Sequence, residues 1–263
     1  MRNLRLIARL DVKLTQLIKG VQMEGWRKVG DPTSFAKRYA QEGADELLFM
    51  DVVASLYERN NLHDMVRMVA SDALIPMTVG GGIRSLEDVS ALLTVGADKV
   101  AINTAATRDP TLVTQISDTF GSQATVVSIE TVKQGNNWLV MTDNGRNHTG
   151  LNAVEWAREV EQRGAGEILL TAIHAEGLGK GYDLELTRQI CEAVSLPVVA
   201  CGGLGASDHL ADLIDQTSAS AAAAAQALHW NKLTLGDLRD VLDEKDCMLR
   251  PLLPGTASST PAQ

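Results

Sequence analysis

Two acidic residues stand at matching places in the sequence, each at the end of an apolar run. Asp11 ends the run "RLIARLD", and Glu130 ends the run "TVVSIE". If both runs form strands of one parallel sheet, their last residues lie at the same edge of that sheet. Two carboxyl groups that face each other across a pocket can serve as general acid and general base for one reacting centre. Each carboxylate could instead cap the loop that follows it, but the equivalent positions favour catalysis.

Two glycine pairs point to an anionic ligand. Gly81-Gly82 lies in "PMTVGGGIRS" and Gly202-Gly203 lies in "PVVACGGLGAS", and the two pairs are 121 residues apart. Glycine lets the backbone approach a ligand closely, and free amides at the start of the next helix suit a phosphate. The glycines could simply turn the chain, but two pairs in one register favour a small molecule with a phosphate at each end.

The elements that must position these residues alternate along the chain. Short apolar runs are separated by segments of helical periodicity, such as "PTSFAKRYAQEG" and "LEDVSALLTVG", which end on glycine. Strand–helix alternation predicts a parallel sheet, and eight runs in two equal halves favour a closed (β/α)₈ TIM barrel over an open doubly wound sheet. The last run, rich in alanine, could equally form a helix by propensity. The predicted strands are residues 4–11, 46–53, 76–81, 99–105, 125–130, 167–173, 197–203 and 220–226.

The repeated spacing also predicts the domain organisation. A third pair of segments, "GADELLFMD" and "GAGEILLTA", keeps the same 121-residue register. We therefore expect a single barrel domain over residues 1–250, built from two half-barrel repeats at about 1–122 and 123–250. The Pro/Ser/Thr-rich segment 251–263 is expected to be a disordered tail.

Four charged residues stand near the starts of their predicted strands, at the opposite end of the barrel from the acids. They are two cations and two anions: Arg5, Glu46, Lys99 and Glu167. Taken alone, they predict a ring of salt bridges that closes the barrel floor and contributes to stability.

Composition restricts the class of protein. The chain has 263 residues, of which 45% are hydrophobic, and a formal net charge of −9, which argues against a nucleic-acid partner. Its charged N-terminus is unlike a signal peptide and no long apolar run is present, so we expect a cytoplasmic protein without membrane contact. Cys191, Cys201 and Cys247 lack metal-ligand spacing and are interpreted as reduced thiols. We expect neither a metal nor a cofactor.

These residues lie in motifs that resemble a known family. The segments are "RLDVK", "FMDVVAS", "TVGGGIRS", "GADKVAINTAA", "FGSQ", "TGLNAVEWAREVEQRGAGEILLT" and "GYDLELTR". Together, from about Leu4 to His229, they resemble the cyclase subunit of imidazole glycerol phosphate synthase (HisF), a ribulose-phosphate-binding barrel. The resemblance implies an enzyme that uses ammonia from a separate, HisH-like glutaminase. Its substrate is a bis-phosphorylated ribulosyl intermediate, and its products are imidazole glycerol phosphate and aminoimidazole carboxamide ribotide, for histidine and purine synthesis.

The resemblance assigns roles to individual residues. Asp11 becomes the first catalytic acid or base, and Lys19 is expected in a mobile loop over the mouth. The expected phosphate ligands are Gly82, Asn103 and Thr104 at one end and Thr171, Gly177 and Gly203 at the other. The four floor residues match the family's ammonia gate, which implies a glutaminase docked at the N-terminal face of the barrel.

The sequence also departs from the family's pattern, mainly around the expected chemistry. Position 130 is Glu where the family has Asp, and Arg9 replaces a usual Cys. The family's "DRDG" reads "HAEG" here, which introduces His174 and Glu176. The eighth strand has Ala225 and Gln226 near an expected phosphate-binding Ser. Candidates for altered specificity are Arg9, Asp51, His174 and Glu176.

We expect Arg9 to enter the barrel beneath Asp11 and to pair with Asp11 or Glu130, lowering the pKa of its partner. It could instead bind an anionic group of a different substrate. His174 is either an additional acid or base at the mouth or an ordinary loop histidine.

Three functions are therefore compatible with the sequence. The first is the histidine-pathway cyclase, which the phosphate loops and Asp11 favour. The second is a HisF-like paralogue that channels ammonia for acetamidino modification of a nucleotide-linked sugar in surface-polysaccharide synthesis, which Arg9, Glu130 and His174 favour. The third is a non-catalytic subunit that activates its glutaminase.

Overall fold

The predicted apolar runs all form strands of one barrel. The computed structural model describes residues 2–54 and 62–252. In that part of the chain, the barrel strands are β1 (Arg5–Lys13), β4 (Glu46–Asp51), β5 (Met77–Gly80), β6 (Lys99–Ile102), β7 (Thr125–Gln134), β10 (Glu167–Ala172), β11 (Val198–Cys201) and β12 (Ala221–Ala224).

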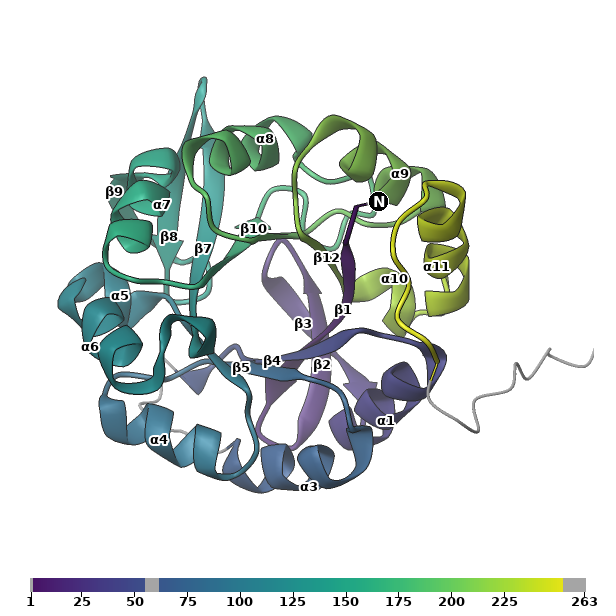
Figure 1. The fold of residues 1–263 in the computed structure, drawn as a ribbon, viewed down its shortest axis with the longest axis horizontal. Coiled ribbons are helices and arrows are strands. Elements are labelled where there is room, and N and C mark those ends of the chain that lie inside the picture. The colour runs from purple at the N-terminus through teal and green to yellow at the C-terminus, as the bar shows by residue number, and fades with distance from the viewer. Residues whose placement is uncertain (1, 55–61, 253–263) are drawn as a thin grey trace, which may run out of the picture.

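The strands are parallel and the sheet closes on itself. Neighbours pair in the order β10-β11-β12-β1-β4-β5-β6-β7, and a further pairing of β10 with β7 completes the cylinder. The predicted (β/α)₈ barrel is confirmed. Figure 1 looks along its axis, with the helices as an outer ring around the strands.

The outer ring consists of helices that bury one apolar side against the barrel, as their helical periodicity predicts. The longer ones are α1 (Pro32–Glu42), α3 (His63–Ala73), α4 (Leu86–Thr94), α6 (Thr111–Phe120), α7 (Ala153–Gln162), α8 (Leu184–Ala193), α9 (Ser207–Gln216) and α11 (Leu235–Glu244). The shorter ones are α5 (Thr104–Arg108), α10 (Gln226–His229) and the 3₁₀ turn η1 (Ser122–Ala124). Helix α1 ends, as predicted, at Gly43, whose φ of 101° lies in the left-handed region that glycine favours.

The alanine-rich segment forms strand β12, so its tertiary position overrides its helical propensity. Arg5 and Ile7 of β1 pair with Ala221 and Ala223 of β12. Without β12 the cylinder would leave two open edges with unpaired backbone groups. Because its residues are small, β12 also leaves space inside the barrel.

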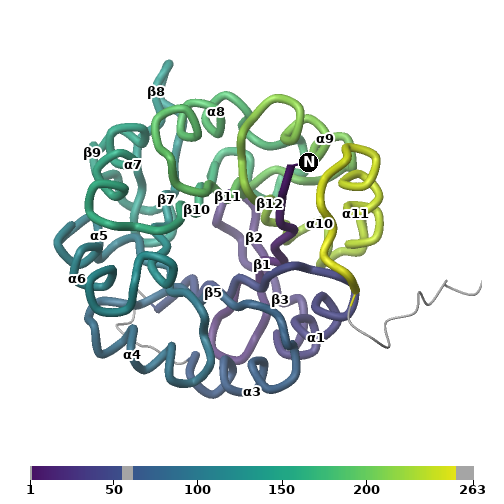
Figure 2. The backbone as a smooth tube through the Cα atoms, viewed as in Figure 1, coloured from purple at the N-terminus to yellow at the C-terminus, as the bar shows by residue number. Residues whose placement is uncertain are grey.

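Two β-hairpins were not predicted from the sequence. They are β2 (Gln16–Val21) with β3 (Glu24–Gly30), and β8 (Asn137–Thr142) with β9 (Asn147–Asn152). Each hairpin continues the first strand of one half-barrel, because β2 pairs with β1 and β8 pairs with β7, both antiparallel. Figure 2 traces the backbone through both. The expectation that Lys19 lies in a loop is wrong, since Lys19 belongs to β2.

Strand β1 shows how the barrel is filled. Leu6, Ala8 and Leu10 belong to the core between barrel and helices, whereas Ile7 belongs to the separate core inside the barrel. This alternation sends every second side chain of β1 inward. Arg9 and Asp11 share the inward set, and both are buried.

Some expectations lie outside what the structure describes. Residues 253–263 of the expected tail fall there, and only Pro251 and Leu252, both exposed, are described. The domain limits and the two half-barrel boundaries remain predictions. Among the described residues, no helix combines the length and apolar character needed to cross a membrane.

Candidate active site at the barrel mouth

Asp11 is held between two cations inside the barrel. Its Oδ1 accepts a hydrogen bond from Arg9 Nε at 2.7 Å, and its Oδ2 accepts one from Lys19 Nζ at 2.7 Å. Lys19 also forms an ion pair with Glu176. Burial alone would raise the pKa of Asp11, but the charges of Arg9 and Lys19 outweigh it and hold that pKa below its ordinary value. Asp11 is therefore a carboxylate at neutral pH, as the predicted pairing with Arg9 implies.

The Arg9 side chain crosses the barrel interior. Its Nη1 lies 3.2 Å from Thr171 Oγ1 on β10 and 3.2 Å from Cys201 Sγ on β11. These strands lie beyond β12 in the sheet order, so the guanidinium reaches past the alanine strand. The small side chains of β12 make this possible, and the three partners explain how a cation is tolerated at 2% exposure.

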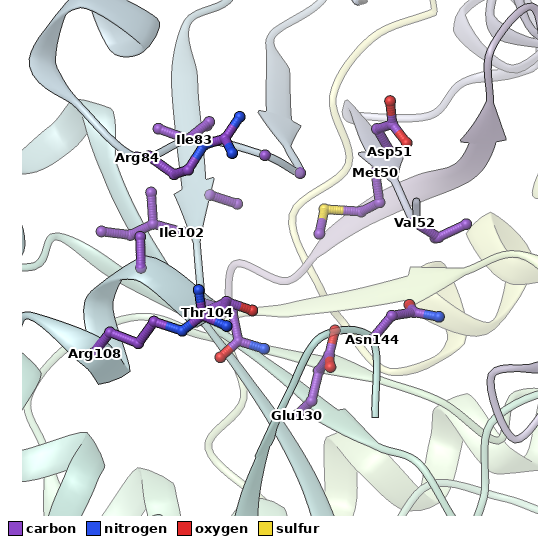
Figure 3. Close-up of a pocket in the computed structure, with 15 residues that line it drawn as sticks. Met50, Asp51, Val52, Ile83, Arg84, Ile102, Thr104, Arg108, Glu130 and Asn144 are labelled. Carbon is purple, nitrogen blue, oxygen red and sulfur yellow. The ribbon is translucent and has the colours of Figure 1, made fainter. Parts of the chain in front are cut away.

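Glu130 lines the open part of the site. Together with Asp51, Gly82, Asn103 and Thr104 it borders a cavity at the carboxyl ends of β4 to β7. Figure 3 shows Glu130 and Asp51 on different sides of this cavity. Burial raises the pKa of Glu130 to about 7, although Arg9 and the amide of Gly145 act in the opposite direction. A carboxyl group with this pKa can both donate and accept a proton near neutral pH.

The two predicted catalytic acids thus differ in their access to the cavity. Glu130 lines it, whereas Asp11 has no exposed surface and does not. The reason is the unpredicted β2–β3 hairpin, which brings Lys19 onto Asp11. The hairpin lies on the loop after β10, where Gln22 N donates to Glu176 O at 2.8 Å and Gln22 Nε2 donates to His174 O at 3.0 Å.

The predicted phosphate residues separate into an open and a covered set. Gly82, Asn103 and Thr104 line the cavity, and no described residue provides a hydrogen bond to Asn103 Oδ1. Neither Gly177 nor Thr171 reaches this cavity.

The covered set is closed off by backbone packing. A Cβ placed on Gly177 would lie 2.6 Å from Gly20 O of the β2–β3 hairpin, so the hairpin sits directly on this loop. Gly203 has a φ of 112°, and a Cβ there would lie 1.9 Å from Gly181 O. Glycine is thus required at 203 by local packing, which the sequence could not distinguish from a requirement imposed by a ligand.

The floor residues form a continuous ionic ring. Arg5 pairs with Glu46 at 2.8 Å and also with Glu167, while Lys99 lies 2.8 Å from Glu46 and 2.6 Å from Glu167. Thr78 donates a further hydrogen bond to Glu46. The predicted proximity of the four residues is confirmed by these contacts, and each carboxylate has two cationic partners.

The remaining candidates for altered specificity occupy different surroundings. Asp51 accepts hydrogen bonds from Val53 N and Ala54 N, both at 3.0 Å, so it caps its own loop while it lines the cavity. His174 Nε2 lies 3.1 Å from Asp183 Oδ2, and His174 is not one of the residues that line the cavity. This contact favours the interpretation of His174 as a loop histidine. No group of three or more potential metal ligands occurs among the described residues.

Comparison with known proteins identifies the family. Residues 5–234 match the model of the family described as "Histidine biosynthesis protein". The chain belongs to this family. Three similar relatives are named "Imidazole glycerol phosphate synthase subunit HisF". The one from Legionella pneumophila is 59% identical over 206 residues, which is 78% of this chain and 97% of the relative. The one from Myxococcus xanthus is 47% identical over 94% of this chain and 98% of the relative. The one from Metallosphaera sedula is 46% identical over 95% and 100%.

The site of this HisF-family barrel contains residues that sequence reasoning missed. Arg84, Arg108 and Asn144 line the cavity, and no described residue partners Asn144 Nδ2. Figure 3 shows Arg108 and Asn144 at its rim. Asn144 comes from the turn of the β8–β9 hairpin, which is not among the predicted elements. The pattern "TDNGR" is a hairpin-turn signal that could have located it.

Proposed function

We propose that this chain is the cyclase subunit of imidazole glycerol phosphate synthase. It takes ammonia from a HisH-like glutaminase and converts a bis-phosphorylated ribulosyl aminoimidazole carboxamide intermediate. The products are imidazole glycerol phosphate and aminoimidazole carboxamide ribotide, so the reaction belongs to histidine biosynthesis. The names of the three relatives support this activity, and the reaction would take place in the cytoplasm.

The proposal rests on the order in which charged, apolar and acidic side chains follow one another along the barrel interior, from the floor to the mouth. The ionic ring lies at the floor, and above it come apolar side chains such as Ile7, Leu48 and Leu169. The Arg9 side chain and then Asp11 follow, and the cavity lined by Glu130 opens at the mouth. A glutaminase docked on the N-terminal face would release ammonia at the ring. Neutral ammonia could then pass the apolar section to the acids, because an apolar interior disfavours a charged ammonium ion.

The different pKa values of the two acids suit different proton transfers. Asp11, a carboxylate at neutral pH, is placed to act as the base. Glu130, whose pKa is about 7, is placed to donate a proton. Because Lys19 occupies Asp11 Oδ2, the substrate would have to replace this hydrogen bond.

The two phosphate groups of the substrate would bind at sites that differ in their accessibility. One would bind at Gly82, Asn103 and Thr104, which line the open cavity. The other would bind near Thr171, Gly177 and Gly203. For the second group to reach Gly177, the β2–β3 hairpin would have to move away from it, since its backbone lies directly against this glycine.

A second candidate is the paralogue that supplies ammonia for acetamidino modification of a nucleotide-linked sugar. The specific observation in its favour is Arg9, which fills the interior between Asp11, Thr171 and Cys201 and changes the charge next to the predicted base. A non-catalytic activating subunit is the third possibility, and it gives Asp11 no chemical role.

Complementation separates these possibilities. A histidine auxotroph that lacks its own cyclase subunit is transformed with this chain and its glutaminase partner, and growth without histidine is measured. We expect the native chain to restore growth and Asp11→Asn to fail at equal expression. Absence of rescue by a folded, expressed native chain would favour the polysaccharide function. Rescue by Asp11→Asn equal to that of the native chain would support a subunit without a catalytic Asp11.

A further inference from the structure

The turn of the β8–β9 hairpin borders the active-site cavity, and its backbone has positive φ at three successive residues. Asp143, Asn144 and Gly145 have φ values of 52°, 58° and 77°, and Arg146 N closes the turn on Thr142 O at 3.0 Å. Asp, Asn and Gly are residues that adopt positive φ in tight hairpin turns, and Asn144 of this turn lines the cavity. The contacts that hold this turn therefore matter for the site.

Asp143 anchors the turn to the phosphate side of the cavity. Its Oδ2 accepts a hydrogen bond from Asn147 Nδ2 at 2.7 Å and lies 3.3 Å from Arg108 Nη2. Its backbone amide donates to Thr104 Oγ1 at 3.0 Å. A neighbouring contact, from Asn103 Nδ2 to the carbonyl of the β8 residue Met141 at 3.1 Å, ties the same hairpin to the loop after β6. Asp143 itself is buried, at 5% exposure, whereas its partners Arg108 and Asn147 are exposed.

The same turn delivers a hydrogen bond to Glu130. Gly145 N donates to Glu130 Oε2 at 3.0 Å. No other described residue donates a hydrogen bond to this carboxylate. The charged groups that act on Glu130 are Arg9 and Asp11 from β1 and Asp143 from the turn. The position of the Gly145 amide is set by the turn, and Asp143 is the buried side chain that fixes the turn.

We propose that Asp143 is a positioning residue for Glu130. By fixing the turn between Arg108, Asn147 and Thr104, it aims the Gly145 amide at the Glu130 carboxylate and connects the phosphate side of the cavity to the proton-transferring group. Its role in turnover rests on the proposed function, whereas its effect on Glu130 does not.

Two substitutions distinguish two effects on the pKa of Glu130: that of the position of the Gly145 amide and that of the charge of Asp143. Asp143→Asn removes the charge but keeps an oxygen that can accept from Asn147, so the turn stays in place. Asp143→Ala removes both. Loss of the negative charge lowers the pKa of Glu130 in both variants, whereas loss of the Gly145 hydrogen bond raises it only in Asp143→Ala. We therefore expect a higher pKa of Glu130 in Asp143→Ala than in Asp143→Asn.

The titration of Glu130 can be followed directly. NMR of protein labelled with ¹³C at the glutamate carboxyl groups reports it, with the signal assigned by Glu130→Gln. Arg146→Ala, which changes an exposed residue of the same turn, serves as the control and should leave the titration unchanged. If Asp143→Ala does not fold, Asn147→Ala removes one exposed anchor instead and should raise the pKa of Glu130 relative to the native chain.

Turnover provides the second measurement. We expect kcat to fall about 10- to 100-fold in Asp143→Ala, a range typical of a displaced catalytic group, with a smaller loss in Asp143→Asn. Equal pKa values of Glu130 in the two variants would overturn the positioning role. A native chain that shows no turnover, while the two variants differ in titration as expected, would contradict the proposed function and leave the role of Asp143 supported.

Discussion

The buried Arg9–Asp11 pair allows the most demanding test of the energetics. The interior group of Arg9, Lys19, Asp11 and Glu176 contains two cations and two anions, so it is neutral as a whole. Arg9→Met keeps much of the apolar stem but leaves two carboxylates with a single ammonium group. Removing one partner of a buried ion pair costs about 3–5 kcal/mol. Since Lys19 still binds Asp11 at 2.7 Å, we expect a loss near the lower limit, about 3 kcal/mol at pH 7.

A double-mutant cycle tests whether Arg9 and Asp11 stabilise each other, and its result does not depend on the size of either single loss in the free energy of unfolding. Asp11→Asn alone leaves an excess of positive charge, whereas Arg9→Met with Asp11→Asn leaves Lys19 and Glu176 as a balanced pair. The double variant should therefore be more stable than the sum of the single losses predicts, by about 2 kcal/mol. Lys13→Met removes an exposed cation from the end of the same strand and should change stability by less than about 0.5 kcal/mol.

Urea unfolding at pH 7, followed by far-UV circular dichroism and tryptophan fluorescence, measures these free energies of unfolding. Two results would contradict these predictions: an Arg9→Met variant as stable as the native chain, or single losses that simply add in the double variant. Either result would mean that the guanidinium does not balance the buried carboxylate.

Two further predictions concern stability. His229 is buried with its Nδ1 2.7 Å from the Tyr39 hydroxyl, and burial lowers its pKa from 6.5 to about 3. Stability that this neutral imidazole provides is complete above pH 6.5 and is lost as the pH falls toward 3. The difference between the native chain and His229→Asn should change by about 4 kcal/mol over this range, and a pH-independent difference in urea unfolding would contradict this. Gly203→Ala should cost at least about 2 kcal/mol because of the contact with the Gly181 carbonyl, whereas Gly135→Ala, with open space around it, should cost about 1 kcal/mol. Equal thermal shifts of the two variants would contradict this prediction.

The barrel itself could be predicted from the sequence because its signals are repeated. Eight apolar runs, the constant 121-residue register and helices that end near glycine all favour the same fold. Even the alanine strand could be assigned, since closure of the barrel decides against its helical propensity. The strand ends also located Asp11 and Glu130, because side-chain alternation fixes which residues face inward.

The sequence could not predict which of these residues meet solvent. Each of β2 and β8 leads through a turn with positive φ into another strand rather than into a helix, so neither fits the strand–helix alternation that predicts the barrel. Their turns meet over the mouth, where Met23, Met141 and Ile173 form a small buried cluster. This packing covers Asp11 with Lys19 and places Gly145 against Glu130, and it depends on residues that are distant in the sequence.

The partner of Arg9 shows a similar limit. From the sequence alone, either Asp11 or Glu130 could pair with Arg9, because both face the barrel interior. The guanidinium reaches Asp11 on its own strand, and its other contacts, Thr171 and Cys201, lie across the alanine strand. Space beside β12, which only the assembled barrel defines, decides the direction of the side chain.

The most direct test of the proposed function is turnover by the purified chain alone. The bis-phosphorylated ribulosyl intermediate is mixed with ammonium salts at alkaline pH, where free ammonia replaces the glutaminase, and formation of aminoimidazole carboxamide ribotide is followed. We predict turnover by the native chain and a loss of at least about 100-fold in Asp11→Asn, since a general acid or base contributes this much. A folded native chain that leaves the intermediate unchanged would contradict the assignment as a cyclase.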